Sequence, residues 1–130
     1  MLQRIAVVDD SSEFQQLIDV MLQYLGIREI HHWASSLEAL PKLIQNPPEL
    51  LILDVMMSGM DGLNVWRELR AQPTTKSLPV IVCTAAINSI VHQEAQLNAD
   101  PLTVILPKPF TLDELRHAMS RVAPLWQVVV

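Results

Sequence analysis

Five polar residues that directly follow short apolar runs have the side-chain types that bind cations and phosphoryl groups. They are Asp9, Asp10, Asp54, Thr84 and Lys108. A single aspartate after a strand is more often a helix cap or a turn former. Several carboxylates at one place, however, repel one another unless a cation is present, and a few oxygen ligands suit Mg²⁺ with its waters. A hydroxyl and an ammonium beside them would help to bind a phosphoryl group and to neutralise its charge.

The apolar runs before these residues are typical of the strands of a parallel α/β sheet. They are rich in Val, Ile and Leu and alternate with segments of helical period; they cover residues 5–8, 27–33, 50–53, 80–83 and 103–106. Four runs are nearly continuous, as expected of strands covered by helices on both faces. The second run is weaker because it contains His31 and His32. Since the carboxyl ends of such strands share one edge of the sheet, the polar residues should meet there.

The spacing of apolar residues between the runs predicts helices. The first has an apolar stripe from Phe14 to Leu25 that includes Leu17, and Gly26 can terminate it. A third helix should follow Gly62, and a fourth, less regular one should lie near 88–97.

The second and the last of these helices begin with a capping-box spacing. The second starts with Ser35 and Glu38 and should bury Leu37. Pro41 predicts that it kinks or begins later, because proline removes a hydrogen bond and clashes with the preceding turn. The last helix begins with a second capping box, formed by Thr111 and Glu114, and its last apolar residue is Val122.

Length and composition fit one globular domain. The chain has 130 residues, half of them apolar, and a net charge of -5, which excludes intrinsic disorder and gives no general attraction to nucleic acid or to anionic membranes. Cys83, the single cysteine, lies in an apolar run, and the chain has neither a spanning segment nor a signal pattern. We expect a cytoplasmic protein with no direct contact to nucleic acid or membrane.

The remaining polar residues have simpler interpretations. The four histidines lack the spacing of a zinc site, and no Ser-His-Asp or Cys-His arrangement is indicated. Gly59 and Gly62 do not form a phosphate-binding loop. Arg67 and Arg70 are expected to lie on a solvated helix face.

Between about Arg4 and Val122 the sequence resembles the receiver domains of bacterial two-component response regulators. Each matching motif is short, but five occur in the family's order, after four of the predicted strands. They are Val8-Asp9-Asp10, Leu53-Asp54-Val55-Met56-Met57 with Met60-Asp61-Gly62, Thr84-Ala85, and Lys108-Pro109-Phe110.

The resemblance implies a fold and a set of residue roles. The fold is a flavodoxin-like doubly wound sheet of five parallel strands in the order 2-1-3-4-5, with helices on both faces. Asp54 would accept a phosphoryl group from a histidine kinase, and Thr84 and Lys108 would bind the phosphoryl oxygens. Mg²⁺ would be held by Asp10 and Asp54 directly, by Asp9 mainly through water, and by the backbone carbonyl of Met56. The Lys108-Pro109 peptide bond is expected to be cis.

This family implies that the protein is a switch rather than a turnover enzyme. Its expected partners are a sensor histidine kinase or phosphotransfer protein and a downstream protein or output domain, with a homodimer as a further possibility. The alternatives are an aspartyl-phosphate hydrolase of α/β type, which needs a second acid/base carboxylate and a substrate cap, and a flavodoxin-like FMN carrier, in which Asp9 and Asp10 would repel the FMN phosphate.

The sequence departs from the family pattern at several positions. Ser58 stands where a proline is common, Ile105 replaces the usual aromatic residue, and the segment 98–102 is longer than typical. Met56 and Ala86 cannot hydrogen-bond a hydrolytic water, so we expect the phosphorylated form to be long-lived.

The receiver is expected to cover residues 1–122 and to leave an apolar tail, 123–130. This tail could begin a linker, form a dimer contact or pack on the domain.

Overall fold

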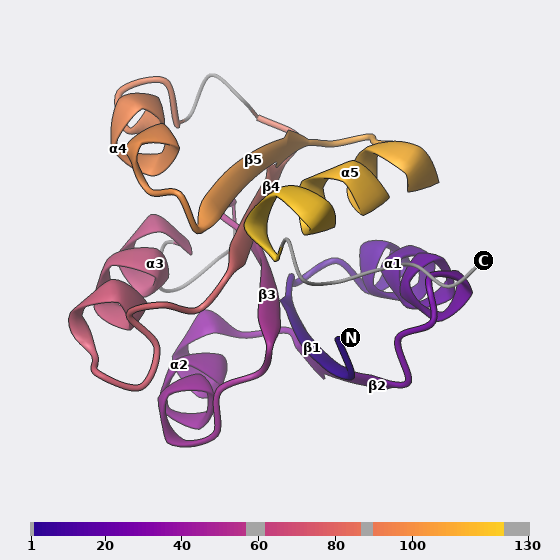
Figure 1. Cartoon of the computed structure of the whole chain (residues 1–130), viewed down its shortest axis with the longest axis horizontal. Coiled ribbons are helices and arrows are strands. Elements are labelled where there is room, and N and C mark those ends of the chain that lie inside the picture. Colours follow the sequence, from indigo (N-terminus) through magenta and orange to yellow (C-terminus); the bar gives the residue numbers. More distant parts are fainter. Residues whose placement is uncertain (1, 57–61, 87–89, 124–130) are drawn as a thin grey trace.

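Five parallel strands form one sheet in the order β2-β1-β3-β4-β5 (Figure 1). The computed structural model describes residues 2–56, 62–86 and 90–123. The strands are β1 (Arg4–Val8), β2 (Glu29–Trp33), β3 (Leu50–Asp54), β4 (Val80–Thr84) and β5 (Thr103–Pro107). The predicted flavodoxin-like order is therefore confirmed, and every predicted run coincides with a strand, although β2 begins two residues later than expected.

Helices cover both faces of the sheet (Figure 1). They are α1 (Ser12–Tyr24), α2 (Ser36–Gln45), α3 (Gly62–Ala71), α4 (Glu94–Ala99) and α5 (Leu112–Val122). Buried residues of α1 and α5 form one apolar cluster with the sheet, and buried residues of α2, α3 and α4 form the other.

The strand side chains alternate between these two clusters. In β3, Leu50 and Ile52 pack in the cluster of α1 and α5, whereas Leu51 and Leu53 pack in the cluster of α2, α3 and α4. This alternation is the period of two expected of a strand, and burial on both faces explains why the run is continuously apolar. It ends at Asp54, the last residue of β3, where the carboxylate reaches the edge of the sheet.

Two predicted core residues lie outside the core. Leu17 is 55% exposed and Leu37 is 63% exposed. Each is one residue away from a buried neighbour, Ile18 and Ser36, and one residue turns the side chain by about 100° around a helix axis. The apolar stripe that was read from the sequence is therefore wider than the face that packs on the sheet.

The helix ends follow the predicted signals except that α2 does not begin later than its capping residue and α4 is shorter than expected. The side chain of Ser35 caps α2 at its predicted start, so the expectation of a later start is wrong and Pro41 lies inside the helix. Thr111 and Glu114 form both hydrogen bonds of the predicted capping box, and Gly26 ends α1 with a φ of 91°. Helix α4 is six residues long and begins later than the predicted 88–97.

The expectations for Ser58 and for almost all of the tail concern residues outside the described ranges. Among the described helices, none combines the length and the apolar character that crossing a membrane requires.

Candidate functional site

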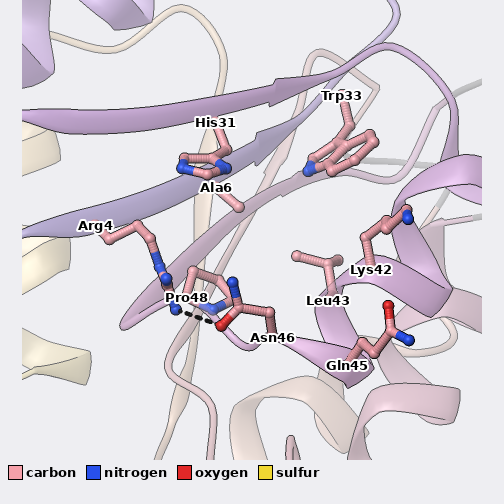
Figure 2. A pocket seen from close by; sticks show the side chains of 9 residues that line it. All are labelled: Arg4, Ala6, His31, Trp33, Lys42, Leu43, Gln45, Asn46 and Pro48. Carbon is pink, nitrogen blue, oxygen red and sulfur yellow. Dashed lines mark hydrogen bonds between the residues drawn. The ribbon is translucent and has the colours of Figure 1, made fainter.

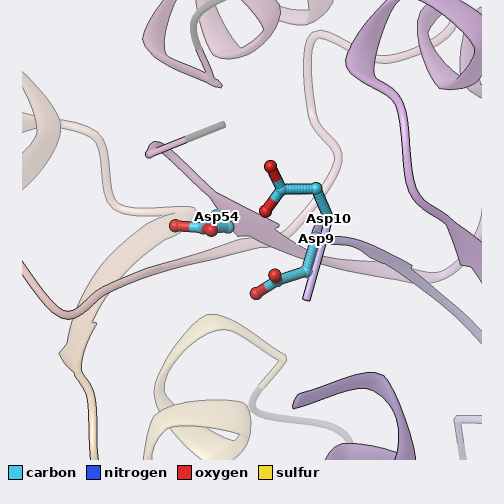
Figure 3. A group of neighbouring side chains, drawn as sticks. All are labelled: Asp9, Asp10 and Asp54. Carbon is cyan, nitrogen blue, oxygen red and sulfur yellow. The ribbon is translucent and has the colours of Figure 1, made fainter. Parts of the chain in front are cut away.

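Three carboxylates meet at the carboxyl edge of the sheet, as predicted (Figure 3). Asp9 directly follows β1 and Asp54 ends the neighbouring strand β3, so the parallel pairing of these strands places both at the same edge. One carboxylate oxygen from each of Asp9, Asp10 and Asp54 lies within 4.8 Å of the others. Asp9 is 1% and Asp54 6% exposed, whereas Asp10 faces solvent.

Lys108 supplies the positive charge at this cluster. Its ammonium lies 2.6 Å from Oδ2 of Asp9 and 3.8 Å from Oδ2 of Asp54. The Phe14 ring packs against the ammonium at 3.9 Å from its centroid, and Phe110 contacts Phe14 edge-on. The Lys108-Pro109 peptide bond is cis, as predicted. Lys108 is therefore held between two carboxylates and an aromatic face, which together restrict where its charge can lie.

The environment of Asp54 shifts the pKa of its carboxylate. Burial raises its pKa above the ordinary value, and repulsion by Asp9 and Asp10 acts in the same direction. The Met56 N–H, which donates to Oδ1 of Asp54 at 3.0 Å, and the Lys108 charge oppose this rise. The carboxylate is thus buried and oriented, and its ionised form costs free energy that a further cation would offset.

Thr84 ends β4, next to β3 in the sheet. It is fully buried, and its hydroxyl oxygen accepts a hydrogen bond from the Ala86 N–H at 3.0 Å. The Thr84 carbonyl accepts from the Lys108 N–H at 2.9 Å, which ties the ends of β4 and β5 together. The predicted hydroxyl and the predicted ammonium therefore belong to adjoining strand ends of one edge.

Gly62 shows why the chain after Asp54 requires a glycine. It is the first residue of α3, and a Cβ at this position would lie 2.4 Å from the Asp54 carbonyl oxygen and 2.6 Å from Cα of Val55. The sequence motif included this glycine but gave no reason for it. The reason is the close approach of the helix to the backbone of the buried carboxylate.

Gln15 is a residue of this region that the sequence analysis missed. Its side-chain amide donates to the backbone carbonyls of Asp9 at 3.0 Å, Trp33 at 3.2 Å and Val7 at 3.4 Å. Its carbonyl oxygen contacts Nδ1 of His32 at 2.5 Å. This side chain joins the ends of β1 and β2 directly behind Asp9. Because the amide donates to backbone atoms, whose position does not depend on residue type, no motif in the sequence could have indicated these contacts.

Arg70 contradicts the expectation of a solvated face. Its guanidinium pairs with Asp100 at 2.7 Å and donates to the Thr103 hydroxyl at 3.1 Å and to the Thr75 carbonyl at 3.1 Å. The indole N–H of Trp66 also donates to the Thr103 hydroxyl, at 2.9 Å. These contacts connect α3 to the segment between α4 and β5, the segment that the sequence marked as longer than typical. The expectation was wrong because the partner of Arg70 is 30 residues away in the chain.

Asp100 is stabilised as a carboxylate by this network. Burial alone would raise its pKa, but hydrogen bonds from the Leu102 N–H, Arg70 and Thr103 outweigh burial, so that its pKa lies below the ordinary value. Cys83, which lies in an apolar run of the sequence, is fully buried, and burial raises the pKa of its thiol.

The fold and the site together define a doubly wound α/β domain with an acidic, lysine-containing edge. A family model described as "Response regulator receiver domain" matches residues 5–120, and the chain belongs to this family. It is therefore a receiver domain of two-component response regulators.

The chain is similar to curated relatives over nearly its whole length. It is 40% identical to the response regulator MprA of Mycobacterium avium over 117 residues, which is 89% of this chain and 49% of that protein. MprA of Mycobacterium sp. (strain KMS) is 37% identical over 125 residues, 93% of this chain and 52% of that protein. The chain thus spans about half the length of the curated relatives that it matches.

Solved structures agree with this assignment. The receiver domain of the sensor histidine kinase PA1611 from Pseudomonas aeruginosa, which has a magnesium ion in its active-site cleft, matches with a TM-score of 0.79 and 30% identity, over 93% of this chain and 97% of that one. The chemotaxis protein CheY4 of Vibrio cholerae matches with a TM-score of 0.80 and 28% identity, over 94% of this chain and 99% of that one.

Proposed function

We propose that Asp54 is the phosphoacceptor of this receiver domain. The observation that carries the proposal is the position of its carboxylate, buried at the end of β3 with Asp9 and Asp10 on one side and the Lys108 ammonium 3.8 Å away. In the reaction, an oxygen of Asp54 forms a bond to phosphorus while the bond from phosphorus to the donor histidine nitrogen breaks. The product is an acyl phosphate on this chain.

The donor set at the edge fits Mg²⁺. Three carboxylates within 4.8 Å offer hard oxygen atoms, and a single lysine leaves their charge only partly neutralised. Asp10 and Asp54 would hold the ion directly, Asp9 through water, and the Met56 carbonyl would complete the protein ligands. When bound, Mg²⁺ would neutralise charge on the phosphoryl oxygens and on the carboxylates.

Thr84 and Lys108 would bind the other phosphoryl oxygens, the first by its hydroxyl and the second by its charge. For this role the Lys108 ammonium has to move only from a carboxylate oxygen to a phosphoryl oxygen at the same edge. The Thr84 hydroxyl can donate to the phosphoryl group while its oxygen keeps the hydrogen bond from Ala86.

The wider function follows from this chemistry. The chain would catalyse its own phosphorylation and dephosphorylation without turning over a substrate, take its phosphoryl group from a sensor histidine kinase or phosphotransfer protein in the cytoplasm, and change its affinity for a downstream protein or output domain. The receiver would span residues 1–122, and the tail would lead to an output domain, contact a second copy or pack on the domain. Family membership supports this function over an aspartyl-phosphate hydrolase or an FMN carrier.

Phosphorylation of the wild type and of two variants tests the assignment of the acceptor. The wild type, Asp54→Ala and Asp113→Asn are incubated with acetyl phosphate and Mg²⁺, and intact mass is measured. Asp113 is an exposed aspartate of α5 and serves as the matched control. We expect a gain of one phosphoryl group in the wild type and in the control, and none in Asp54→Ala. Phosphorylation of Asp54→Ala at the wild-type rate, or of no variant at all, would contradict the proposal.

A further inference from the structure

A hollow of about 300 Å³ lies on the opposite side of β2 from α1, between that edge strand and α2 (Figure 2). Its floor is formed by small or compact residues, since Ala6 of β1 and Pro48 before β3 are both buried there. Ala6 is paired with His31 in the sheet, and the small side chain of Ala6 leaves space beside the side chains of β2. The hollow therefore results from the sequence of β1 and does not involve the carboxylate cluster.

Basic and amide side chains surround this hollow, although the chain is acidic overall. Arg4, His31 and Lys42 line it, and none of the residues that line it is acidic. The Arg4 guanidinium is held in place by the Asn46 side chain at 3.2 Å and by the Pro47 carbonyl at 2.5 Å. No ion pair or hydrogen bond of the Lys42 ammonium occurs within the described ranges. The hollow thus has one fixed and one unpaired positive charge.

Two carboxylates contact residues that line the hollow, and they neutralise only part of its charge. Glu29 contacts the His31 ring at 3.3 Å, and Glu49 accepts hydrogen bonds from the backbone N–H groups of Gln3 and Arg4 at 2.9 Å. Both lie outside the lining. His31 keeps a second ring nitrogen for a ligand, and Lys42 has no acidic partner in the part of the chain that the structure describes.

Trp33 provides a flat apolar surface on the same hollow. The rings of His31 and Trp33, two residues apart on β2, both line it, and Trp33 lies opposite Lys42 and Leu43 of α2 (Figure 2). Trp33 is half-buried, and within the described segments no acceptor contacts its indole N–H. An indole face favours a planar ring, and the indole N–H offers one more donor.

We propose that this hollow binds a small planar organic anion, with its ring against Trp33 and its carboxylate or phosphate among Arg4, His31 and Lys42. Its volume is at the lower end of the usual range for small-molecule sites. A ring without charge would leave the donors unmatched, and a charge without a ring would leave the indole face in water. Both parts of the ligand are therefore needed. The site uses none of the residues assigned to phosphoryl transfer.

NMR titration of the full chain in the absence of Mg²⁺ tests the site. Three probes separate the two parts of the ligand: naphthoate has ring and charge, naphthol has the ring alone, and acetate has the charge alone. The signal of the Trp33 indole N–H reports the site, and that of Trp66, which donates to Thr103, is the internal reference. We expect naphthoate to bind saturably with a Kd of about 1 mM or tighter. It should shift the Trp33 signal but not that of Trp66, and it should bind at least about tenfold more tightly than either partial probe.

Two lysine variants separate a site from a general charge effect. Lys42→Gln should weaken naphthoate binding about fivefold, which is the range expected for one partly screened charge. Lys76→Gln, the control at an exposed lysine outside the lining, should not change it. Equal effects of the two variants, equal binding of naphthoate and naphthol, or shifts confined to the neighbourhood of Asp54 and Lys108 would overturn the proposal. Trp33→Leu provides a second test, because it should remove the preference for the ring while the affinity for acetate stays the same.

Discussion

Replacing Gly62 by alanine adds one methyl group at the point where α3 meets the backbone of Asp54. In most helices this change is favourable, because alanine is a better helix former than glycine by up to about 1 kcal/mol. At Gly62, however, the new Cβ would lie 2.4 Å from the Asp54 carbonyl oxygen and 2.6 Å from Cα of Val55. Both contacts are with backbone atoms, which cannot rotate away as a flexible side chain can.

The magnitude follows from the distance that must be recovered. Ordinary contacts of a Cβ begin near 3.4 Å, so the start of α3 must retreat from β3 by about 1 Å. Overpacking of this kind costs about 1–3 kcal/mol, and more when backbone must move. After subtraction of the gain in helix propensity, we expect a net loss of about 2 kcal/mol, or a fall in Tm of about 6–10 °C for a chain of this length.

Urea and thermal unfolding followed by circular dichroism measure this loss. Asn64→Ala is the matched control, because Asn64 is an exposed residue of the same helix and its replacement should stabilise the protein by about 0.5 kcal/mol. Gly62→Ala should also slow phosphorylation by acetyl phosphate about tenfold or more at a temperature where it is folded, since Asp54, the proposed acceptor, is displaced. A Gly62→Ala variant as stable as the wild type would refute the close approach as the reason for the glycine.

Four other predictions concern the site and the contacts of Arg70. Without Mg²⁺, Asp54→Asn should raise Tm by about 3–5 °C at pH 7. Because the pKa of Asp54 is raised in the fold, this gain should be present above the raised pKa and should vanish as the pH falls below the ordinary value of 3.8. An equal or lower Tm of the variant at pH 7 would contradict this prediction. Arg70→Ala should cost about 2–4 kcal/mol because it leaves Asp100 partly buried without its partner, whereas Arg116→Ala, at an exposed pair, should cost less than about 0.5 kcal/mol in the same urea titration. Since the pKa of Asp100 is lowered, its contribution to stability should be present above its ordinary pKa and be lost as the pH falls through the lowered value. In Arg70→Ala this pH dependence should be smaller. The acyl phosphate of the isolated protein should persist for minutes or longer, because the exposed Met56 side chain offers the hydrolytic water no hydrogen bond. Mass spectrometry over time after removal of the phosphodonor measures the lifetime of the phosphorylated form. A lifetime of seconds would contradict the prediction.

The sheet could be predicted because its strands are local signals. A run such as 50–53 must be apolar on both faces to be covered by helices, and the structure buries every residue of β3. Where one such run ends in Asp54 and a neighbouring one is followed by Asp9, parallel pairing alone places the carboxylates together. The cluster of acids was therefore within reach of reasoning from the sequence.

Contacts with the backbone and between distant residues could not be predicted in this way. Gln15 reads as an ordinary polar residue of a helix, yet its amide contacts three carbonyls at two strand ends. The position of Arg70 in the helix pattern predicts a residue in water, but Arg70 forms an ion pair with Asp100, which is distant in the sequence. The exposure of Leu17 has the same origin, since the width of the buried face of a helix depends on what packs against it and not on the helix alone.

The charge balance at the edge explains why one lysine and three carboxylates suit a phosphorylation switch. With all groups ionised, Asp9, Asp10, Asp54 and Lys108 carry a net charge of -2. One oxygen of each carboxylate lies within 4.8 Å of the others, and the ammonium lies 2.6 Å from Asp9 and 3.8 Å from Asp54. A divalent cation brings this charge to zero, so the cluster has a strong electrostatic reason to bind Mg²⁺ and none to bind a lone phosphate. Phosphorylation of Asp54, the proposed acceptor, would then replace its single negative charge by about two. The Lys108 ammonium, now shared by two carboxylates, is the positive group of the described site that can turn to this new charge, so phosphorylation should weaken its contact with Asp9.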